Sequence, residues 1–177
     1  MACITKLGDA IVYDCDTGAT GLVSALIINK SDIVSFTYDA PNTRITNITL
    51  ATGAKAYKID TVKRSLVLSE TLKVNDGAPN AYSHSASLVL TAAQSGALRA
   101  LRTALSNGSF VIIARRPDTI SVYGLYYGLS ATASDYSSHD NGGWVTVTLE
   151  TPENVIGEDT TMVEGDVYTA LYEAAVG

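Results

Sequence analysis

Apolar and polar residues alternate along most of this chain, with the period of two that is typical of half-buried β-strands. Short groups of glycine, proline, aspartate and asparagine separate the alternating segments, as chain reversals require. The stretch SFVIIARR is almost continuously apolar before its two arginines, which is typical of a buried strand. The pattern predicts strands over residues 11–13, 22–29, 32–38, 44–50, 55–74, 82–90, 109–116, 119–129, 130–136 and 144–150.

The most regular of these segments predict a long β-hairpin. Residues 66–74 and 82–90 both alternate, and the turn between them, NDGAPN, contains Asp-Gly and Pro. The far end of this hairpin is more polar than its base. We therefore expect it to extend outward to a neighbouring molecule rather than to cover its own core. The apolar face of its first strand comprises Leu66, Leu68, Leu72 and Val74.

A single well-marked helix interrupts the β pattern over residues 91–107. Thr91 and Gln94 have the spacing of a capping box, and Asn107 with Gly108 provides a stop. Arg99 and Arg102 lie off the apolar stripe. The helix is therefore amphipathic and suited to covering one face of a sheet. Its stripe comprises Leu98, Leu101 and Leu105, widened by Ala97 and Ala104.

The C-terminal segment predicts a second, shorter helix. Val163, Val167, Leu171 and Ala174 recur at nearly helical spacing, and a capping box is predicted at Thr161 and Glu164. Gly165 weakens this pattern, so an extended docking arm is the alternative. We expect a single mainly β domain of the α+β type over residues 1–155, followed by a C-terminal extension over 156–177.

Composition and charge narrow the class of protein. The chain has 177 residues, 46% of them apolar and 17% charged, which is typical of a folded protein. Its start has no signal-peptide pattern, and its apolar runs are too short to span a bilayer. We therefore expect a protein that is made and assembled in the cytoplasm.

The charges are unevenly distributed along the chain. In the first 90 residues the numbers of basic and acidic residues are equal. Residues 91–116 hold four arginines and no acidic residue. The rest of the chain has ten carboxylates and no Lys or Arg. This asymmetry is consistent with complementary charged surfaces on repeated copies of one chain. An equal alternative is that the charges lie on faces that only contact water and keep the protein in solution. Sequence-specific nucleic-acid binding is disfavoured, because it requires a concentrated basic patch.

Residues able to carry catalysis or hold a metal are few. His139 has Ser137 and Asp140 beside it, but neighbours in one loop cannot easily take the three positions of a catalytic triad. Cys3 and Cys15 are interpreted as small structural residues rather than a disulfide. The segment 14–21 superficially resembles a calcium loop but lacks the later acidic ligands. We expect neither an enzyme, a cofactor nor a metal site.

An aromatic cluster supports one alternative function. Tyr123, Tyr126 and Tyr127 lie close together in the chain, and exposed tyrosines can bind sugars as well as fill a core or an interface. Together with Trp144 they could make a carbohydrate- or receptor-binding β module. A small enzyme centred on His139 is a further, weaker alternative.

Three stretches carry a resemblance to a known family. They are MACITKLGDAIVYDCDTGATGLVSALIIN, HSASLVLTAAQSGALRALRTALSNGSFVIIARR and GGWVTVTLETPEN. The order of strands, long hairpin, helix and strands resembles bacteriophage tail-tube-like virion proteins, the tail-tube and head–tail ring proteins of crAss-like and other Bacteroidetes phages. The resemblance covers most of residues 1–155, and residues 156–177 run beyond it.

The resemblance implies a fold and a role. The fold would be a tail-tube-like β-sandwich or barrel with a flanking helix. The role would be a homo-oligomeric ring of six-fold or twelve-fold symmetry in the virion, next to portal, tail or further ring proteins. Genomic DNA would pass through its lumen without sequence-specific binding, and no membrane would be involved. The net charge of −6 suits such a conduit, because an acidic wall repels phosphate.

Seven residues are the candidates for contacts between copies in such a ring. Four belong to the basic middle of the chain and three to the predicted hairpin. An arginine surface on one copy could set the register against the acidic last third of the next. The candidate interface residues are Arg99, Arg102, Arg115, Arg116, Asp76, Tyr82 and His84.

Overall fold

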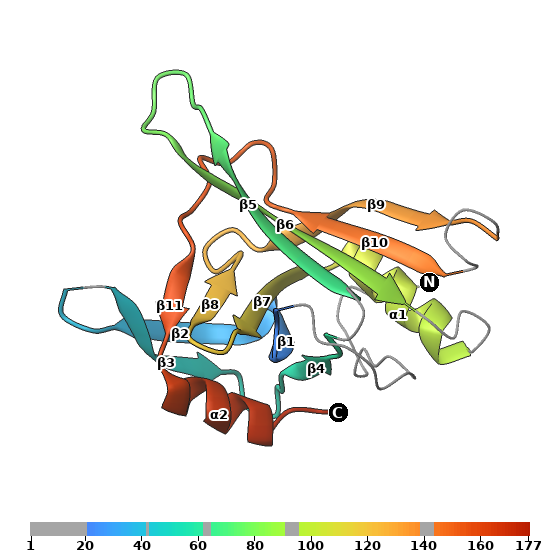
Figure 1. The fold of residues 1–177 in the computed structure, drawn as a ribbon, viewed down its shortest axis with the longest axis horizontal. Helices are drawn as coiled ribbons and strands as arrows, with labels where there is room; N and C mark the ends of the chain where they lie inside the picture. Colours follow the sequence, from blue (N-terminus) through green and yellow to red (C-terminus); the bar gives the residue numbers. More distant parts are fainter. Residues whose placement is uncertain (1–20, 42, 62–64, 91–95, 139–143) are drawn as a thin grey trace.

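The structure is a computed structural model that describes residues 21–41, 43–61, 65–90, 96–138 and 144–177 (Figure 1). Strands make up 49% and helices 16% of it, so the predicted mainly β class is confirmed. The predicted segment 11–13, the cysteines Cys3 and Cys15, residues 14–20 of the segment 14–21, and His139 lie outside the described residues.

Eleven strands of the described residues form one mixed sheet, ordered β2-β3-β11-β8-β7-β9-β10-β6-β5, with β1 between β7 and β4. Most neighbours are antiparallel, and β11 runs parallel to β3. The strands are β1 Ser24–Asn29, β2 Ile33–Tyr38, β3 Arg44–Leu50, β4 Tyr57–Ile59, β5 Leu66–Lys73, β6 Ala81–Leu90, β7 Ser109–Arg115, β8 Ile120–Tyr123, β9 Leu129–Tyr136, β10 Val145–Glu150 and β11 Thr161–Val163.

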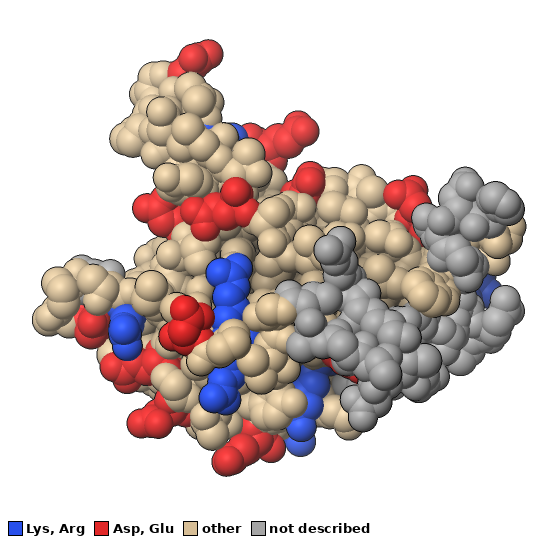
Figure 2. Space-filling model, viewed as in Figure 1, with Lys and Arg blue, Asp and Glu red and all other residues tan. Residues whose placement is uncertain are grey.

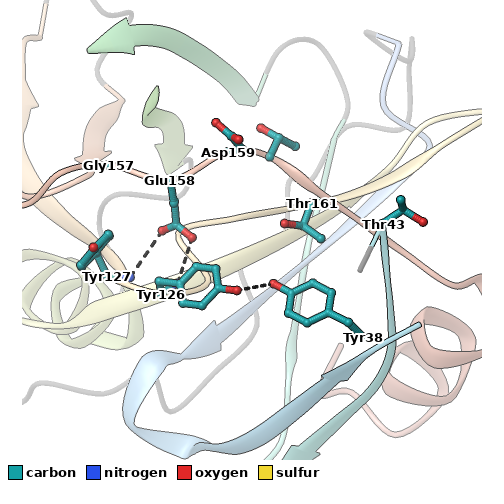
Figure 3. A pocket seen from close by; sticks show the side chains of 9 residues that line it. Tyr38, Thr43, Tyr126, Tyr127, Gly157, Glu158, Asp159 and Thr161 are labelled. Atoms are coloured by element: carbon teal, nitrogen blue, oxygen red, sulfur yellow. Dashed lines mark hydrogen bonds between the residues drawn. The ribbon is translucent and has the colours of Figure 1, made fainter. Parts of the chain in front are cut away.

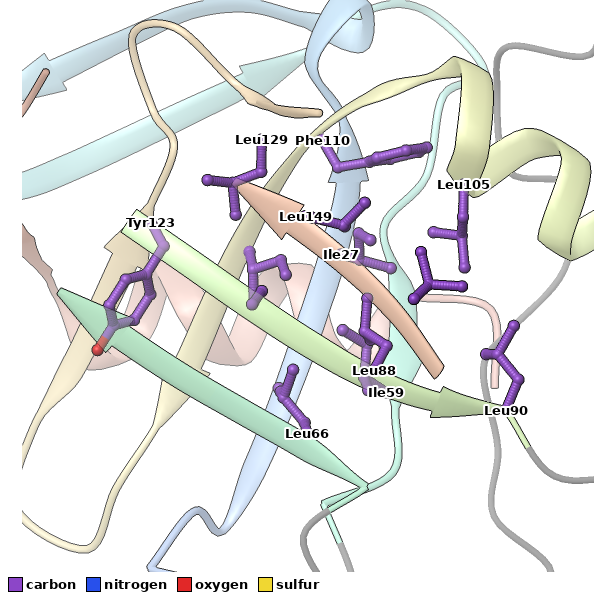
Figure 4. Close-up of a cluster of buried hydrophobic side chains, with 14 of the residues drawn as sticks. Ile27, Ile59, Leu66, Leu88, Leu90, Leu105, Phe110, Tyr123, Leu129 and Leu149 are labelled. Carbon is purple, nitrogen blue, oxygen red and sulfur yellow. The ribbon is translucent and has the colours of Figure 1, made fainter. Parts of the chain in front are cut away.

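Two hydrophobic cores lie on opposite faces of the central pair β1–β7. Successive side chains of a strand point to opposite faces, so Ile27 and Ile112 enter one core while Leu26 and Ile113 enter the other. This explains why both strands are continuously apolar in sequence. The first core, shown in Figure 4, also receives the inward faces of β6 and β10, including Leu88 and Leu149.

Helix α1, Gly96–Asn107, covers the β9–β10 side of the first core (Figure 1). Leu101 and Leu105 are buried there and Leu98 packs against them, as the apolar stripe predicts. Ala104 is also buried, whereas the capping pair Thr91 and Gln94 and the side chain of Ala97 lie outside the described part.

The C-terminal helix is confirmed, but its predicted capping box is wrong. Helix α2 spans Gly165–Glu173, and Glu164 is its N-cap without any side-chain hydrogen bond. Thr161 instead belongs to β11, which lies between β3 and β8. Because Tyr168 is buried in the second core and Val167 packs against that core, the helix is anchored to the sheet.

The predicted long hairpin is confirmed as β5 and β6, whose turn projects beyond the rest of the sheet in Figure 1. Its predicted start at residue 55 is wrong, because residues 57–59 form the separate strand β4, which pairs with β1. The register is regular over eight pairs, from Leu66 opposite Leu88 to Lys73 opposite Ala81. The half of the hairpin nearer Leu66 contributes to the first core. We call the projecting half, residues 70–84, the arm.

Candidate functional site

A segment from the C-terminal third, residues 151–160, lies along the arm. The backbone N–H of Thr151 donates to the carbonyl of His84, and that of Glu158 donates to the carbonyl of Tyr82, each at 2.9 Å. On the other strand, Lys73 Nζ donates to the carbonyl of Glu153 at 2.8 Å. The arm is therefore supported by an irregular segment along its length and is not an isolated hairpin, which would be marginal in water.

The tip of the arm exposes apolar side chains. Leu72 is 54% exposed and Val74 71% exposed, although they share the face of β5 that buries Leu66 in the core. Tyr82, opposite Leu72, is 37% exposed, and Ile156 of the adjacent segment is 47% exposed. The far end of the hairpin is more polar than its base, but it also exposes these apolar side chains, because the apolar face of the hairpin continues past the point where the core ends.

The arm also carries an open sheet edge. Within the described ranges, β5 pairs only with β6, and β2 pairs only with β3 at the other end of the strand order. The outer backbone groups of such strands are available to pair with another chain. An open edge beside exposed apolar side chains is the combination that favours contact between molecules.

A buried histidine joins the arm to the rest of the molecule. His84 is fully buried, and its Nδ1 accepts a hydrogen bond of 3.1 Å from the backbone N–H of Gly124. An accepting Nδ1 places the proton of the neutral ring on Nε2, which lies 3.1 Å from the Thr160 hydroxyl. Thr160 in turn donates to the carboxylate of Glu70. One chain of hydrogen bonds therefore connects four separate segments.

The surroundings of His84 favour its neutral form. Burial lowers the pKa of His84 below its ordinary value of 6.5, against the attraction of the carboxylates of Glu70 and Asp159. The ring also contacts Tyr123 edge-on, with 5.3 Å between the ring centroids. His84 was predicted as an interface residue, and the structure places it in the interior of the chain.

A groove of about 650 Å³ lies beside the base of the arm (Figure 3). The hydroxyls of Tyr38 and Tyr126 are 2.6 Å apart across it, and Tyr127 is 39% exposed. Asp159 also lines the groove. The chemistry of the walls, aromatic rings beside hydroxyls and carboxylates, suits a polyhydroxylated ligand. The lining residues are Tyr38, Thr43, Tyr126, Tyr127, Gly157, Glu158, Asp159, Thr160 and Thr161.

One wall of this groove is fixed by a buried carboxylate. Glu158 accepts hydrogen bonds from the backbone N–H groups of Tyr126, at 2.9 Å, and Tyr127, at 3.4 Å. Burial raises the pKa of Glu158, and these N–H donors oppose the rise. Burial likewise raises the pKa of Tyr38 to about 12. The groove is thus preformed, because its tyrosines are positioned by the chain itself.

The remaining predicted interface residues lie on three different surfaces. Asp76 and Tyr82 are exposed on the arm. Arg99 is exposed on α1, whereas Arg102 of the same helix donates to the hydroxyl and the carbonyl of Ser134, both at 2.9 Å. Arg115 and Arg116 are exposed at the end of β7 and line a second groove with Arg44.

The aromatic cluster predicted from sequence divides between interior and surface. Tyr123 is only 4% exposed and belongs to the first core, so it cannot join Tyr126 and Tyr127 in a surface site. The groove residues Tyr38, Glu158 and Arg44 were not predicted from the sequence. No local motif marks them, because each meets its partners only when distant segments of the chain come together.

Comparison with protein-family models, with curated proteins and with solved structures finds no match to this chain. Within the ranges that the structure describes, no group of three or more His, Cys, Asp or Glu side chains is placed to hold a metal ion. None of the helices in those ranges is long and apolar enough to cross a membrane.

Proposed function

We propose that this chain is the structural subunit of a homo-oligomeric ring in a bacteriophage particle, in the tail tube or at the head–tail connector. In this proposal the fold is a tail-tube-like β-sandwich, the ring encloses the channel for DNA, and the subunit catalyses no reaction. The observation that carries the proposal is the arm, a supported projection whose tip exposes Leu72, Val74 and Tyr82. The resemblance of the strand, hairpin and helix order to tail-tube-like proteins supports the same role.

The energetics of the arm favour association. Full burial of a Leu or Val side chain stabilises by about 1.5–3 kcal/mol, and the tip presents several large apolar side chains to water. A contact between an arm and a different surface of the next copy is heterologous, and such contacts close into a ring when the rotation fits. The net charge of −6 lets DNA pass through such a ring without being held.

Negative-stain electron microscopy of the purified chain over a range of concentrations tests this proposal. Rings or stacked rings with a central channel are the expected result, with the copy number read directly from top views. Separate particles of one subunit each at every concentration would contradict it.

The groove beside Tyr38 favours a second candidate function, a carbohydrate- or receptor-binding module of a phage particle. Exposed tyrosine rings stack on sugar rings, and carboxylates accept hydrogen bonds from sugar hydroxyls. A glycan array tests this candidate, with Tyr127→Ala as the groove variant. Tyr136→Ala is the matched control, because Tyr136 is 51% exposed on β9 and does not line the groove. Binding that is lost in the first variant only would favour the module.

A further inference from the structure

A second groove, of about 260 Å³, lies at the turn between β7 and β8 and the start of α2. Three arginines from two distant parts of the chain line it: Arg44 at the start of β3, and Arg115 with Arg116 at the end of β7. Apolar side chains, including Ile120 and Met162, also line it, and Met162 is 44% exposed there. The groove therefore combines positive charge with an accessible apolar contact.

The arginines of this groove are available for a ligand. In the described part of the chain, none of the three guanidinium groups lies within 4.0 Å of a carboxylate oxygen, although Asp118 lines the same groove. Arg116 donates one hydrogen bond of 3.3 Å to the hydroxyl of Tyr123. Arginine binds carboxylates bidentately, so the best partner is an acidic side chain next to an apolar one.

The tip of the arm has this chemistry. Asp76 is exposed in the turn between β5 and β6, two residues after Val74, which is 71% exposed. Figure 1 places that turn at the opposite side of the molecule from α2 and from the turn between β7 and β8. In Figure 2 acidic side chains lie on and around the arm, whereas basic and acidic side chains lie together over the lower part of the body. The arm cannot reach the groove of its own chain.

We propose that the arm of one copy docks into the arginine groove of a second copy. The carboxylate of Asp76 binds the guanidinium groups of Arg44 and Arg115, and Val74 packs against Met162. Each copy then offers one arm and one groove, which is the head-to-tail contact that a ring needs. This inference rests on the proposed function and assigns the two surfaces of its subunit contact.

Nucleic acid is the competing occupant, because a phosphate would also bind three arginines. The exposed Met162 side chain favours the arm, because it adds nothing to phosphate binding but matches the apolar side of the arm. The net charge of −6 and the carboxylate of Asp118 in the groove do not separate the two occupants, because both occupants are acidic.

A charge exchange between the two surfaces tests the contact. Asp76→Lys alone, or Arg44→Glu with Arg115→Glu, should raise the concentration needed for assembly by at least about tenfold, and the combination of all three should restore most of it. Lys55→Glu, which changes an exposed lysine outside both grooves, is the control that should assemble normally. Thermal melting of each variant confirms that the monomer is folded. Unchanged assembly in the separate variants, or no recovery in the combination, would overturn the docking.

Photo-crosslinking separates failure of this contact from failure of the ring. A benzophenone amino acid in place of Val74 should crosslink to a peptide of a second copy that contains residues 115–120 or 162. Rings that crosslink elsewhere would overturn the docking and leave the ring proposal intact. A chain that stays monomeric at every concentration would overturn both. Retention of the protein on duplex DNA tests the competing occupant. If Arg44→Glu with Arg115→Glu abolishes this retention and leaves assembly intact, the groove is assigned to phosphate instead.

Discussion

The backbone N–H of Gly124 donates a hydrogen bond of 3.1 Å to Nδ1 of the buried His84. His84 belongs to the arm, and Gly124 begins the turn that carries Tyr126 into the groove. The bond requires an unprotonated Nδ1. One of the hydrogen bonds that attach the arm to the rest of the chain therefore depends on the neutral form of this histidine.

We predict that the chain loses stability as the pH falls below 6.5. Because burial lowers the pKa of His84 in the folded state, the unfolded state binds a proton first as pH falls. The contribution of His84 is thus fully present above its ordinary pKa of 6.5 and is lost as pH decreases toward the folded-state value. The carboxylates of Glu70 and Asp159 moderate the loss, and the Thr160 hydroxyl also faces the ring. Urea unfolding at a series of pH values measures it.

His84→Gln is the matched variant for this pH dependence. A glutamine oxygen can accept from Gly124 and its amide can donate to Thr160, but the side chain does not titrate. The slope of stability below pH 6.5 should be reduced in this variant. A slope identical to that of the original chain would assign the effect to another group.

Two arginines of α1 should behave differently when each is changed to alanine. Arg102→Ala removes two hydrogen bonds to Ser134 and should lower the free energy of unfolding by about 1–2 kcal/mol. Arg99→Ala changes an exposed side chain and should leave stability unchanged. Chemical denaturation of both variants makes the comparison. Equal losses would show that the contact between α1 and β9 does not depend on Arg102.

A glycine holds the C-terminal segment against the arm. Gly157 has φ +102°, and a Cβ added there would lie 2.5 Å from the carbonyl oxygen of Tyr82. Gly53 has φ +82°, but a Cβ there meets nothing within 4 Å. Gly53→Ala should therefore cost about 1 kcal/mol for backbone strain alone, and Gly157→Ala clearly more. Thermal unfolding measures both, and a smaller loss in Gly157→Ala would contradict this geometry.

Much of the strand pattern could be predicted from sequence, because the outward and inward faces alternate cleanly. Val145, Val147 and Leu149 of β10 are buried as their spacing predicts, and the apolar stripe of α1 reaches the core. The error at the C-terminus has a physical reason. Thr161 and Glu164 fit a capping box locally, but parallel pairing of β11 with distant β3 overrides that local preference.

The sites were harder to predict than the fold, because they join residues that are far apart in the chain. Tyr38 meets Tyr126, and Arg44 meets Arg115, only after the strands have paired. The alternation of β6 places His84 on the buried face that carries Ala86 and Leu88, but it does not show which other segments contact the ring. The exposure of Val74 likewise depends on where the core ends, and the sequence pattern of one hairpin does not show this.

Mass photometry over a concentration series tests the central claim, assembly through the arm, most directly. The original chain should form, as its concentration rises, a species whose mass is a whole-number multiple of the mass of one subunit. Leu72→Ser with Val74→Ser should stay monomeric at the same concentrations and remain folded, because both side chains are exposed. Val67→Ser, which changes the opposite face of β5, should assemble like the original chain. Assembly that survives the loss of Leu72 and Val74, or a chain that never assembles, would contradict the account.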